Sequence, residues 1–382
     1  MASDMIRASL YTTNSDMKRE SKKKRRQRKR RIIIAAILTV VLACAAVWFL
    51  ERLLVPKYVD DIVEGAFVAE YYQEENKDFD VIFVGDCEVY ENFSPVVLWK
   101  EHGINSYIRG SAEQYIWQSY YLMEDCFRCH VPEAVVFNIQ SLQFNESQNE
   151  AYNRMSIEGM RWSPSKVGSI LASMTEEEHF IEYVFPILRY HSRWNELKST
   201  DFEYMFHSKK VTHNGYYMRI DCRPAEDVPP GRPLADYTFG DKAMEYLDKI
   251  RTLCEEKGVK LLFIKAPSLY PEWYPEYEEQ VEAYAAKYNV PYINFLEIQD
   301  ETGVDYTTDT YDGGLHMNLS GAEKLAHYIG PVLRDMGVSD RSDDPELKKI
   351  WEENIADYEK EIKEQEAEYG ITYVSPLKEG EE

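Results

Sequence analysis

An uninterrupted apolar segment near the N-terminus sets the first limit on how this 382-residue chain can fold. The segment Ile32–Leu50 contains 19 residues without a single charge. A helix rises about 1.5 Å per residue, so this segment would extend roughly 28 Å, the thickness of one bilayer core. We therefore expect residues 32–50 to form a single transmembrane helix.

The charges in front of this segment predict its orientation. Residues 1–31 contain 12 Lys and Arg against 3 acids. Because positive charge stays on the cytoplasmic side of a membrane, we expect residues 1–31 to be a cytoplasmic tail and the main domain to be extracytoplasmic. Two cleavage alternatives exist, a signal-peptide site at Ala43–Ala45 and a lipoprotein site at Cys44. Both need a shorter basic region and leave an apolar mature N-terminus, which favours the retained anchor.

The rest of the chain is strongly acidic. The net charge of the whole chain is −23 at pH 7, whereas its first 31 residues carry +9, which leaves −32 for the remainder. A surface of this sign repels nucleic acids and other polyanions. We therefore expect no nucleic-acid partner, and we assign the basic block to the membrane-proximal tail.

Short apolar runs alternate with helical segments after the anchor. We expect strands at 80–85, 104–110, 133–140, 260–267 and 291–296, and helices at 95–102, 112–125, 241–257, 274–287 and 320–336. Runs that are apolar on both faces are typical of parallel strands covered on both sides. The pattern predicts an α/β fold with a mainly parallel sheet of about five strands flanked by helices.

The same pattern suggests a domain organisation. We expect a stalk at 51–78 and an α/β domain at 79–337. A helical insertion at about 141–240 interrupts the domain, because the alternation is lost there. An acidic helical extension, peripheral or partner-facing, is expected at 338–382.

One cysteine occupies a position typical of functional sites. In "VGDCEVY", Cys87 directly follows the first predicted strand, and sites in parallel sheets form at the carboxyl ends of strands. A free thiol is mostly protonated at pH 7, so a nucleophilic Cys87 needs a base from another strand-end loop. Alternatively, Cys87 is inert, or it forms a redox pair with Cys126 or Cys129.

The best candidate for the base is His316 in "DTYDGGLHMNLSG". We expect it in a loop before a helix capped by Ser320, with Asp312 folding back onto the imidazole because Gly313 and Gly314 permit a tight bend. Nucleophile, base and orienting carboxylate would then form a triad.

Several neighbouring residues have supporting or alternative roles. Asp309 is an alternative orienting carboxylate, and Asn318 is expected to brace the loop. Asp86 could cap the turn after the first strand, and Lys265 could either reach the site or form a buried ion pair. There is no second CxxC and no His-x-His spacing, so we expect neither a metal site nor a cofactor.

The motifs "VGDC" and "DGGLHMN" together resemble the SGNH/GDSL hydrolase family, with Cys87 in place of the family's serine. The resemblance covers about residues 79–140 and 241–336. It implies a flavodoxin-like three-layer fold, with His316 as base and Asp312 one residue further from it than in the family's Asp-x-x-His.

The resemblance also implies where an oxyanion would be stabilised. Gly110, at the end of the second predicted strand, matches the family's second-motif glycine, whose N–H helps to form the oxyanion hole. The family's third motif, Gly-x-Asn-Asp, is absent. Its place is taken by Asn138–Gln143, where Gln140 or Asn138 would substitute.

The arrangement of an anchor before an SGNH-like domain is similar to the D-alanine transfer proteins of teichoic-acid modification and to polysaccharide O-acetylation proteins. This similarity implies a membrane-anchored acyltransferase or esterase acting on acyl groups of a cell-envelope glycan. A membrane-bound O-acyltransferase would be its partner. The alternative is a non-catalytic SGNH-like protein that binds a glycan or serves as a scaffold for that partner.

Overall fold

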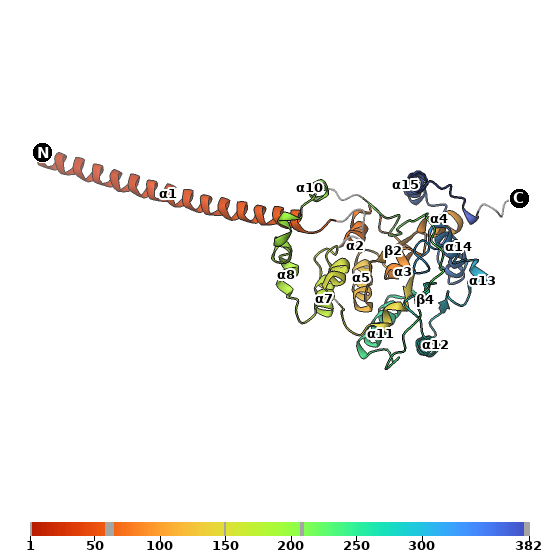
Figure 1. The fold of residues 1–382 in the computed structure, drawn as a ribbon. Helices are drawn as coiled ribbons and strands as arrows, with labels where there is room; N and C mark the ends of the chain where they lie inside the picture. Colours follow the sequence, from red (N-terminus) through yellow and green to blue (C-terminus); the bar gives the residue numbers. More distant parts are fainter. Residues whose placement is uncertain (1, 58–64, 149, 207–209, 378–382) are drawn as a thin grey trace. The chain divides into compact units, whose positions relative to one another are not determined.

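A single five-stranded sheet forms the centre of the α/β unit. The computed structural model describes the chain except residues 1, 58–64, 149, 207–209 and 378–382, and gives only the helical backbone for 2–21. All strand pairs are parallel, in the order β2-β1-β3-β4-β5 (Figure 1). The strands are β1 (Val81–Gly85), β2 (Ser106–Gly110), β3 (Ala134–Asn138), β4 (Lys260–Lys265) and β5 (Tyr292–Asn294).

This strand order is that of flavodoxin-like doubly wound sheets, in which the winding reverses between the first and third strands. The prediction of an α/β fold with about five strands is confirmed. The sheet is entirely parallel, where the sequence predicted only a mainly parallel one.

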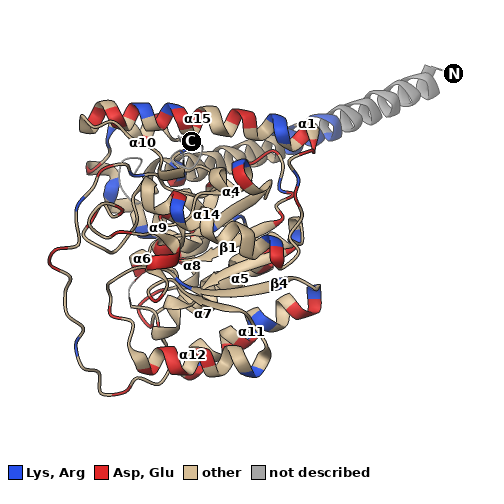
Figure 2. Cartoon of the chain, turned by 90° about the vertical axis from the view of Figure 1, so that its right-hand side faces the viewer, with Lys and Arg blue, Asp and Glu red and all other residues tan. Residues whose placement is uncertain are grey.

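Side chains alternate between the two faces of the sheet, as successive residues of a strand must. In β1, Val81 and Phe83 belong to one hydrophobic core, and Ile82 and Val84 belong to another. Helices cover both faces (Figure 2). The first core includes α4 (Pro95–His102), α14 (Leu319–Asp335) and α15 (Pro345–Tyr369), and the second includes α5 (Ile116–Cys129), α11 (Asp241–Lys257) and α12 (Pro275–Tyr288).

Local capping explains where two helices begin. The Ser94 hydroxyl accepts a hydrogen bond from the N–H of Val97, which starts α4 as predicted. At α14 the cap is Asn318, whose side chain accepts from the N–H of Gly321 at 3.3 Å. The prediction that Ser320 caps this helix is therefore wrong, because Asn318 is an equally good capping residue two positions earlier.

Shorter elements connect this framework. They are α2 (Ala66–Glu70), η1 (Tyr71–Gln73), α3 (Cys87–Tyr90), η2 (Ile139–Gln143), α6 (Glu150–Ile157), α7 (Pro164–Ser173), α8 (Phe180–Val184) and α13 (Gln299–Thr302). Between residues 141 and 240, the described part of the chain contributes no strand to the sheet.

The segment after Ala66 belongs to the α/β unit and not to a separate stalk. Phe67 lies in the first core, and Tyr71 and Phe79 lie in the second. Of the stalk predicted at 51–78, residues 58–64 lie outside the described residues.

The C-terminal helix α15 is packed onto the first face of the sheet, although it was expected to be peripheral. Trp351 is fully buried and stacks on Trp99, with ring centroids 5.4 Å apart and planes 9° apart. Its indole N–H donates to Asn105 Oδ1 at 3.1 Å. One buried stripe, which also includes Leu347 and Tyr358, is therefore enough to dock an otherwise acidic helix.

Residues 1–56 and 185–205 form a second compact unit. It contains the long helix α1 (Ala2–Leu54), together with α9 (Ile187–Tyr190), η3 (His191–Asn195) and α10 (Ser199–Glu203). The last turn of α1 is tied to these short helices: Arg52 donates to the carbonyl of Met205, and Arg193 donates to that of Leu54. Among the described residues, one stretch, Lys22–Leu54, is long and apolar enough to be a membrane span or a signal sequence.

Candidate active site

Cys87 is the first residue of α3, immediately after β1. The Asp86 side chain caps this helix by accepting from the N–H of Glu88 at 3.2 Å. Cys87 is partly exposed, whereas its neighbours on both sides are buried. Because β1 lies next to the point where the winding of the sheet reverses, Cys87 lies where open parallel sheets bind their ligands.

The loop that carries His316 is closed by a β-bridge between Thr310 and Met317. Within it, Gly313 and Gly314 have φ values of 91° and 104°, which confirms the predicted tight bend at these two glycines. The Thr310 hydroxyl donates to the carbonyl of His316 at 2.8 Å. The loop therefore holds the backbone of His316 in a fixed position.

Asp312 folds back onto His316 in the way that the four-residue spacing suggests. Its Oδ2 lies 2.7 Å from the imidazole Nδ1. Its Oδ1 accepts from the backbone N–H groups of His316 and Leu315 at 2.9 and 3.2 Å. The carboxylate therefore fixes both the ring and the backbone of the histidine.

Asp309, the alternative orienting residue, is occupied elsewhere. Its Oδ2 forms an ion pair with Lys324 at 2.6 Å and accepts from the N–H of Asp305 at 2.7 Å. Asp312, and not Asp309, is therefore the carboxylate that contacts His316.

The structure brings the Cys87 segment and the His316 loop together. Asn92, just after α3, accepts from the N–H of Met317 at 2.8 Å. His316 Nε2 is buried, and the ring lies close enough to Cys87 for each group to shift the pKa of the other. Burial raises the pKa of the Cys87 thiol to about 11, and the nearby His316 imidazole partly offsets this effect. At pH 7 the thiol is therefore protonated.

Two further residues complete the surroundings of His316, and sequence reasoning missed both. Glu91 Oε2 lies 3.7 Å from His316 Nδ1, and the Tyr311 hydroxyl donates to this carboxylate. The Tyr311 ring lies nearly parallel to the imidazole, with centroids 6.0 Å apart. In the sequence Glu91 is one of three acids between residues 86 and 91, and nothing distinguishes it from Asp86 and Glu88.

The carboxylates beside His316 determine its protonation. Burial alone lowers the pKa of His316, but the charge of Glu91 and the hydrogen bond to Asp312 raise it well above 6.5. For Glu91, burial raises the pKa, and the charge of His316 partly offsets this rise. The imidazole therefore becomes a neutral base only at pH values above its ordinary range.

Gly110 ends β2 directly opposite Gly85 of β1. A Cβ on Gly110 would lie 3.1 Å from the Tyr90 ring and 3.3 Å from the carbonyl of Asp86, so glycine permits a close approach here. Gln140 follows β3 and is buried, and neither atom of its amide has a hydrogen-bond partner among the described residues.

Asn138, the other candidate donor to an oxyanion, is already hydrogen-bonded to residues that follow the neighbouring strands. Its amide donates to Asp86 and to Glu88, both at 3.1 Å, and its Oδ1 accepts from the N–H of Ala266. Glu88 forms a buried ion pair with Lys265 at 3.0 Å. Of the two roles suggested for Lys265, reaching the site or forming a buried ion pair, the structure shows the second. Of the two amides considered, only that of Gln140 remains available.

Asn318 braces the loop, as its position suggested. Besides capping α14, its Nδ2 donates to the carbonyls of Thr308 and Asp221 at 2.8 and 3.3 Å. Asn318 therefore joins the His316 loop to the segment before residue 222.

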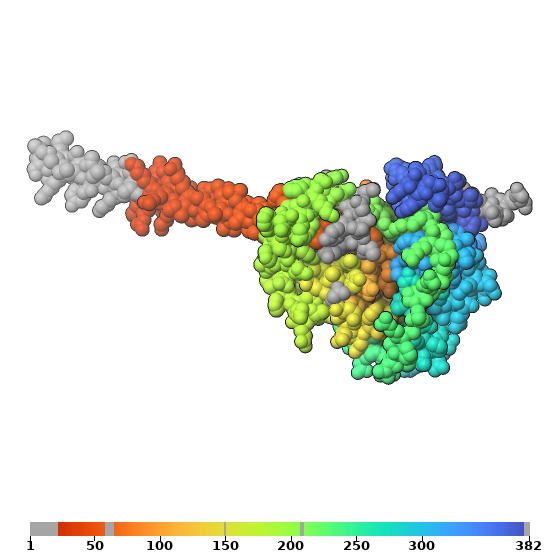
Figure 3. All heavy atoms as spheres, in the orientation of Figure 1, coloured from red at the N-terminus to blue at the C-terminus, as the bar shows by residue number. Residues whose placement is uncertain are grey.

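A groove of about 560 Å³ opens beside this site. It lies between residues 210–219 and α15, which are side by side at the surface (Figure 3). Its lining is polar and includes Tyr217, Tyr369 and Arg219. The Arg219 guanidinium lies 4.6 Å from the centre of the Tyr311 ring, which connects one end of the groove to the surroundings of His316.

All six cysteines are unpaired in the structure. Cys126 is buried in the second core, whereas Cys129 is exposed, so the CxxC sequence does not form a disulfide here.

No protein-family model matches the sequence, and no curated protein is detectably similar to it. Only the fold and the candidate site indicate the class of this protein. It is an α/β protein with an all-parallel, doubly wound sheet and an N-terminal apolar helix that could span a membrane. It has a cysteine, a histidine and two carboxylates at the carboxyl edge of that sheet.

Proposed function

We propose that the protein is a membrane-anchored, extracytoplasmic SGNH-like acyltransferase or esterase that acts on acyl groups of a cell-envelope glycan. The observation that carries this proposal is the contact between Asp312 and His316 at 2.7 Å, in a loop fastened beside Cys87. A carboxylate that orients a histidine next to a strand-end nucleophile is the arrangement used for acyl transfer.

In the proposed reaction, neutral His316 accepts the thiol proton as Cys87 Sγ attacks the acyl carbonyl carbon. The tetrahedral intermediate collapses, and the alcohol leaves with the proton from His316, so that a thioester remains on Cys87. A sugar hydroxyl or water then attacks the thioester while His316 accepts its proton. The thiolate leaves and regains that proton.

The developing oxyanion needs fixed donors. The amide of Gln140 is the side-chain candidate, because it is buried and has no partner among the described residues. The backbone N–H groups of Gly110 and Cys87 are the other candidates. Asp86 and Asn318 would act indirectly, by holding the turn after β1 and the His316 loop.

Retention of the anchor is supported by the N-terminal unit itself. Helix α1 continues beyond the apolar segment to Leu54, and its last turn is bonded to residues 185–205. That segment exposes Phe185, Leu188, Trp194 and Phe202. Tryptophan and other apolar side chains at the end of a span suit the membrane interface. We propose a single-pass protein with a cytoplasmic N-terminus and a membrane-bound O-acyltransferase as partner.

The groove between residues 210–219 and α15 would receive the acceptor. Its polar lining with Tyr217 and Tyr369 suits a sugar, which offers both hydroxyl groups and apolar ring faces.

A second candidate function is a non-catalytic, SGNH-like glycan-binding or scaffold protein. The raised pKa of Cys87 favours it, because a thiol with a pKa of about 11 is a weak nucleophile at pH 7.

One assay separates the two functions. Full-length protein in detergent is mixed with p-nitrophenyl acetate at pH 8 and 9, as wild type, Cys87→Ala and Cys222→Ala. If the protein is an enzyme, wild type should release p-nitrophenol. Cys87→Ala should abolish this release, and Cys222→Ala, which replaces an exposed cysteine, should retain it. Equal release by wild type and Cys87→Ala would contradict it. No release by wild type, together with glycan binding that is equal in wild type and Cys87→Ala, would support the second function.

A further inference from the structure

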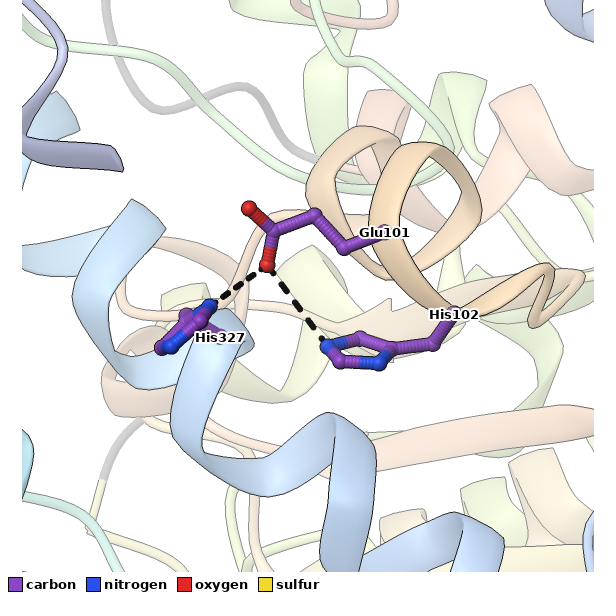
Figure 4. A group of neighbouring side chains, drawn as sticks. All are labelled: Glu101, His102 and His327. Atoms are coloured by element: carbon purple, nitrogen blue, oxygen red, sulfur yellow. Dashed lines mark hydrogen bonds and ion pairs between the residues drawn. The ribbon is translucent and has the colours of Figure 1, made fainter. Parts of the chain in front are cut away.

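A cluster of two histidines and one glutamate lies between two helices on the first face of the sheet. Glu101 and His102 end α4, and His327 projects from α14 toward them (Figure 4). One ligand atom from each side chain lies within 4.8 Å of the other two. Glu101 Oε2 is 2.6 Å from His327 Nδ1 and 3.6 Å from His102 Nε2.

We propose that Glu101, His102 and His327 bind a divalent transition-metal ion of the Zn²⁺ type, although the sequence suggested no metal site. Two imidazole nitrogens and one carboxylate oxygen are ligands that Zn²⁺ accepts, whereas Ca²⁺ and Mg²⁺ prefer oxygen ligands alone. Three protein ligands leave one tetrahedral position for water. The His327 side chain is exposed, so it can turn to close the remaining distance.

The environment of His102 supports this assignment independently. Its Nε2 is buried and has no hydrogen-bond partner among the described residues. The ring occupies space that only a glycine leaves free, because a Cβ on Gly330 would lie 2.0 Å from His102 Cδ2. Glycine is unfavourable inside a helix, and here it lets the imidazole lie against α14, three residues after His327.

Charge and protonation also suit a cation. The cluster lies at the C-terminal end of α4, where the helix dipole favours positive charge. A metal ion binds the neutral form of an imidazole and the ionised form of a carboxyl group. Arg334 and Asp340 are the other charged groups that influence the ring and its surroundings.

The ion would clamp α4 to α14 and take no part in catalysis. His327 lies eight residues after Leu319, the first residue of α14, which corresponds to about 12 Å along the helix from the end that adjoins the His316 loop. Helix α4 follows the segment that carries Cys87, and α14 follows the loop that carries His316. The site is therefore independent of the proposed acyl-transfer function.

The test uses full-length protein in detergent, stripped with a chelator and with its cysteines alkylated so that thiolates cannot bind metal. Thermal unfolding is recorded with and without Zn²⁺ for wild type, His102→Ala, His327→Ala and the control His130→Ala. His130 is a surface histidine paired with only one acid, Asp78, at 3.1 Å.

We expect Zn²⁺ to raise the Tm of wild type and of His130→Ala by at least about 3 °C, because a ligand of the native state stabilises it. His102→Ala and His327→Ala should lose this rise. Co²⁺ should give a visible absorption spectrum of tetrahedral type in wild type and His130→Ala, and not in His102→Ala or His327→Ala. No Tm rise in wild type, or an equal rise in His327→Ala, would overturn the proposal and leave an ion pair between Glu101 and His327.

Discussion

The Glu91 carboxylate lies 3.7 Å from Nδ1 of His316, the same nitrogen that Asp312 contacts at 2.7 Å. The two acids come from different segments of the chain, since Glu91 follows α3 and Asp312 belongs to the His316 loop. One carboxylate fixes the ring, and the second adds negative charge in a buried position. Glu91 therefore links the protonation of His316, the proposed base, to the segment that carries Cys87, the proposed nucleophile.

Glu91→Gln should shift the pH dependence of activity. A nearby negative charge stabilises the imidazolium, so its removal should lower the pKa of His316. In the proposed reaction His316 acts as a neutral base, so activity should rise with pH through that pKa. The acid limb of kcat/KM should therefore move to lower pH in Glu91→Gln, by about one pH unit or more.

The control for this measurement is Glu88→Gln. It removes a buried acid of α3, three residues before Glu91, that pairs with Lys265 and not with His316. An unmoved acid limb in Glu91→Gln would mean that Glu91 does not influence the base.

Asp312→Asn should lower kcat by about 10³- to 10⁴-fold while the protein remains folded, because the amide can no longer fix the reactive tautomer of His316. Asp309→Asn is the matched control, since Asp309 pairs with Lys324 and does not touch the imidazole. Its kcat should stay within about threefold of wild type. Equal losses in the two variants would show that loop stability, and not ring orientation, limits the reaction.

Trp351→Ala should destabilise the α/β unit by about 3–5 kcal/mol, because it removes a fully buried ring that stacks on Trp99 and leaves a cavity under α15. Denaturant unfolding of the full-length chain measures this loss. Trp162→Ala is the control, because Trp162 is 53% exposed, and its effect should be about 1 kcal/mol or less. A small effect of Trp351→Ala would mean that α15 is not an integral part of the fold.

The buried carboxyl group of Glu70 should make the stability of the folded protein depend on pH. Burial raises its pKa from 4.5 to about 7, although hydrogen bonds from Thr212 and Val211 act against this shift. A carboxyl whose pKa is raised in the folded state stabilises the fold below pH 4.5, and the stabilisation is lost as pH rises through 7. Wild type should therefore lose about 3 kcal/mol relative to Glu70→Gln between pH 4 and pH 8.

Thermal unfolding of both proteins at these two pH values checks this expectation. The difference in Tm between Glu70→Gln and wild type should be several degrees more favourable to the variant at pH 8 than at pH 4. A difference that does not change with pH would show that Glu70 titrates normally.

Much of the fold could be predicted from the sequence because its strands are apolar on both faces. Val81–Gly85 and Ala134–Asn138 follow from this pattern, and α11 was predicted at its observed bounds. The contact of Asp312 with His316 was predictable for a local reason, since two glycines between them permit the bend. Such features depend on nearby residues alone.

The features that were missed depend on tertiary contacts. Glu91 looks like any acid in the sequence, and only the packed fold buries it beside His316. The acidic composition of α15 suggested a peripheral helix, because three buried residues in 25 leave a weak pattern. Asn138 and Gln140 were equally good amides until the strand ends gave Asn138 its partners.

In the proposed mechanism, Cys87 carries an acyl group under the control of His316. The most direct measurement is intact-protein mass spectrometry after brief exposure of the full-length chain to p-nitrophenyl acetate at pH 8, with peptide mapping of the adduct. We predict a single hydroxylamine-sensitive acetyl adduct on Cys87, which is strongly reduced in His316→Ala and unchanged in Cys222→Ala. An adduct on Cys87 that forms equally fast in His316→Ala would show that His316 does not activate the thiol. The absence of any adduct on Cys87 would show that this thiol is not an acyl carrier.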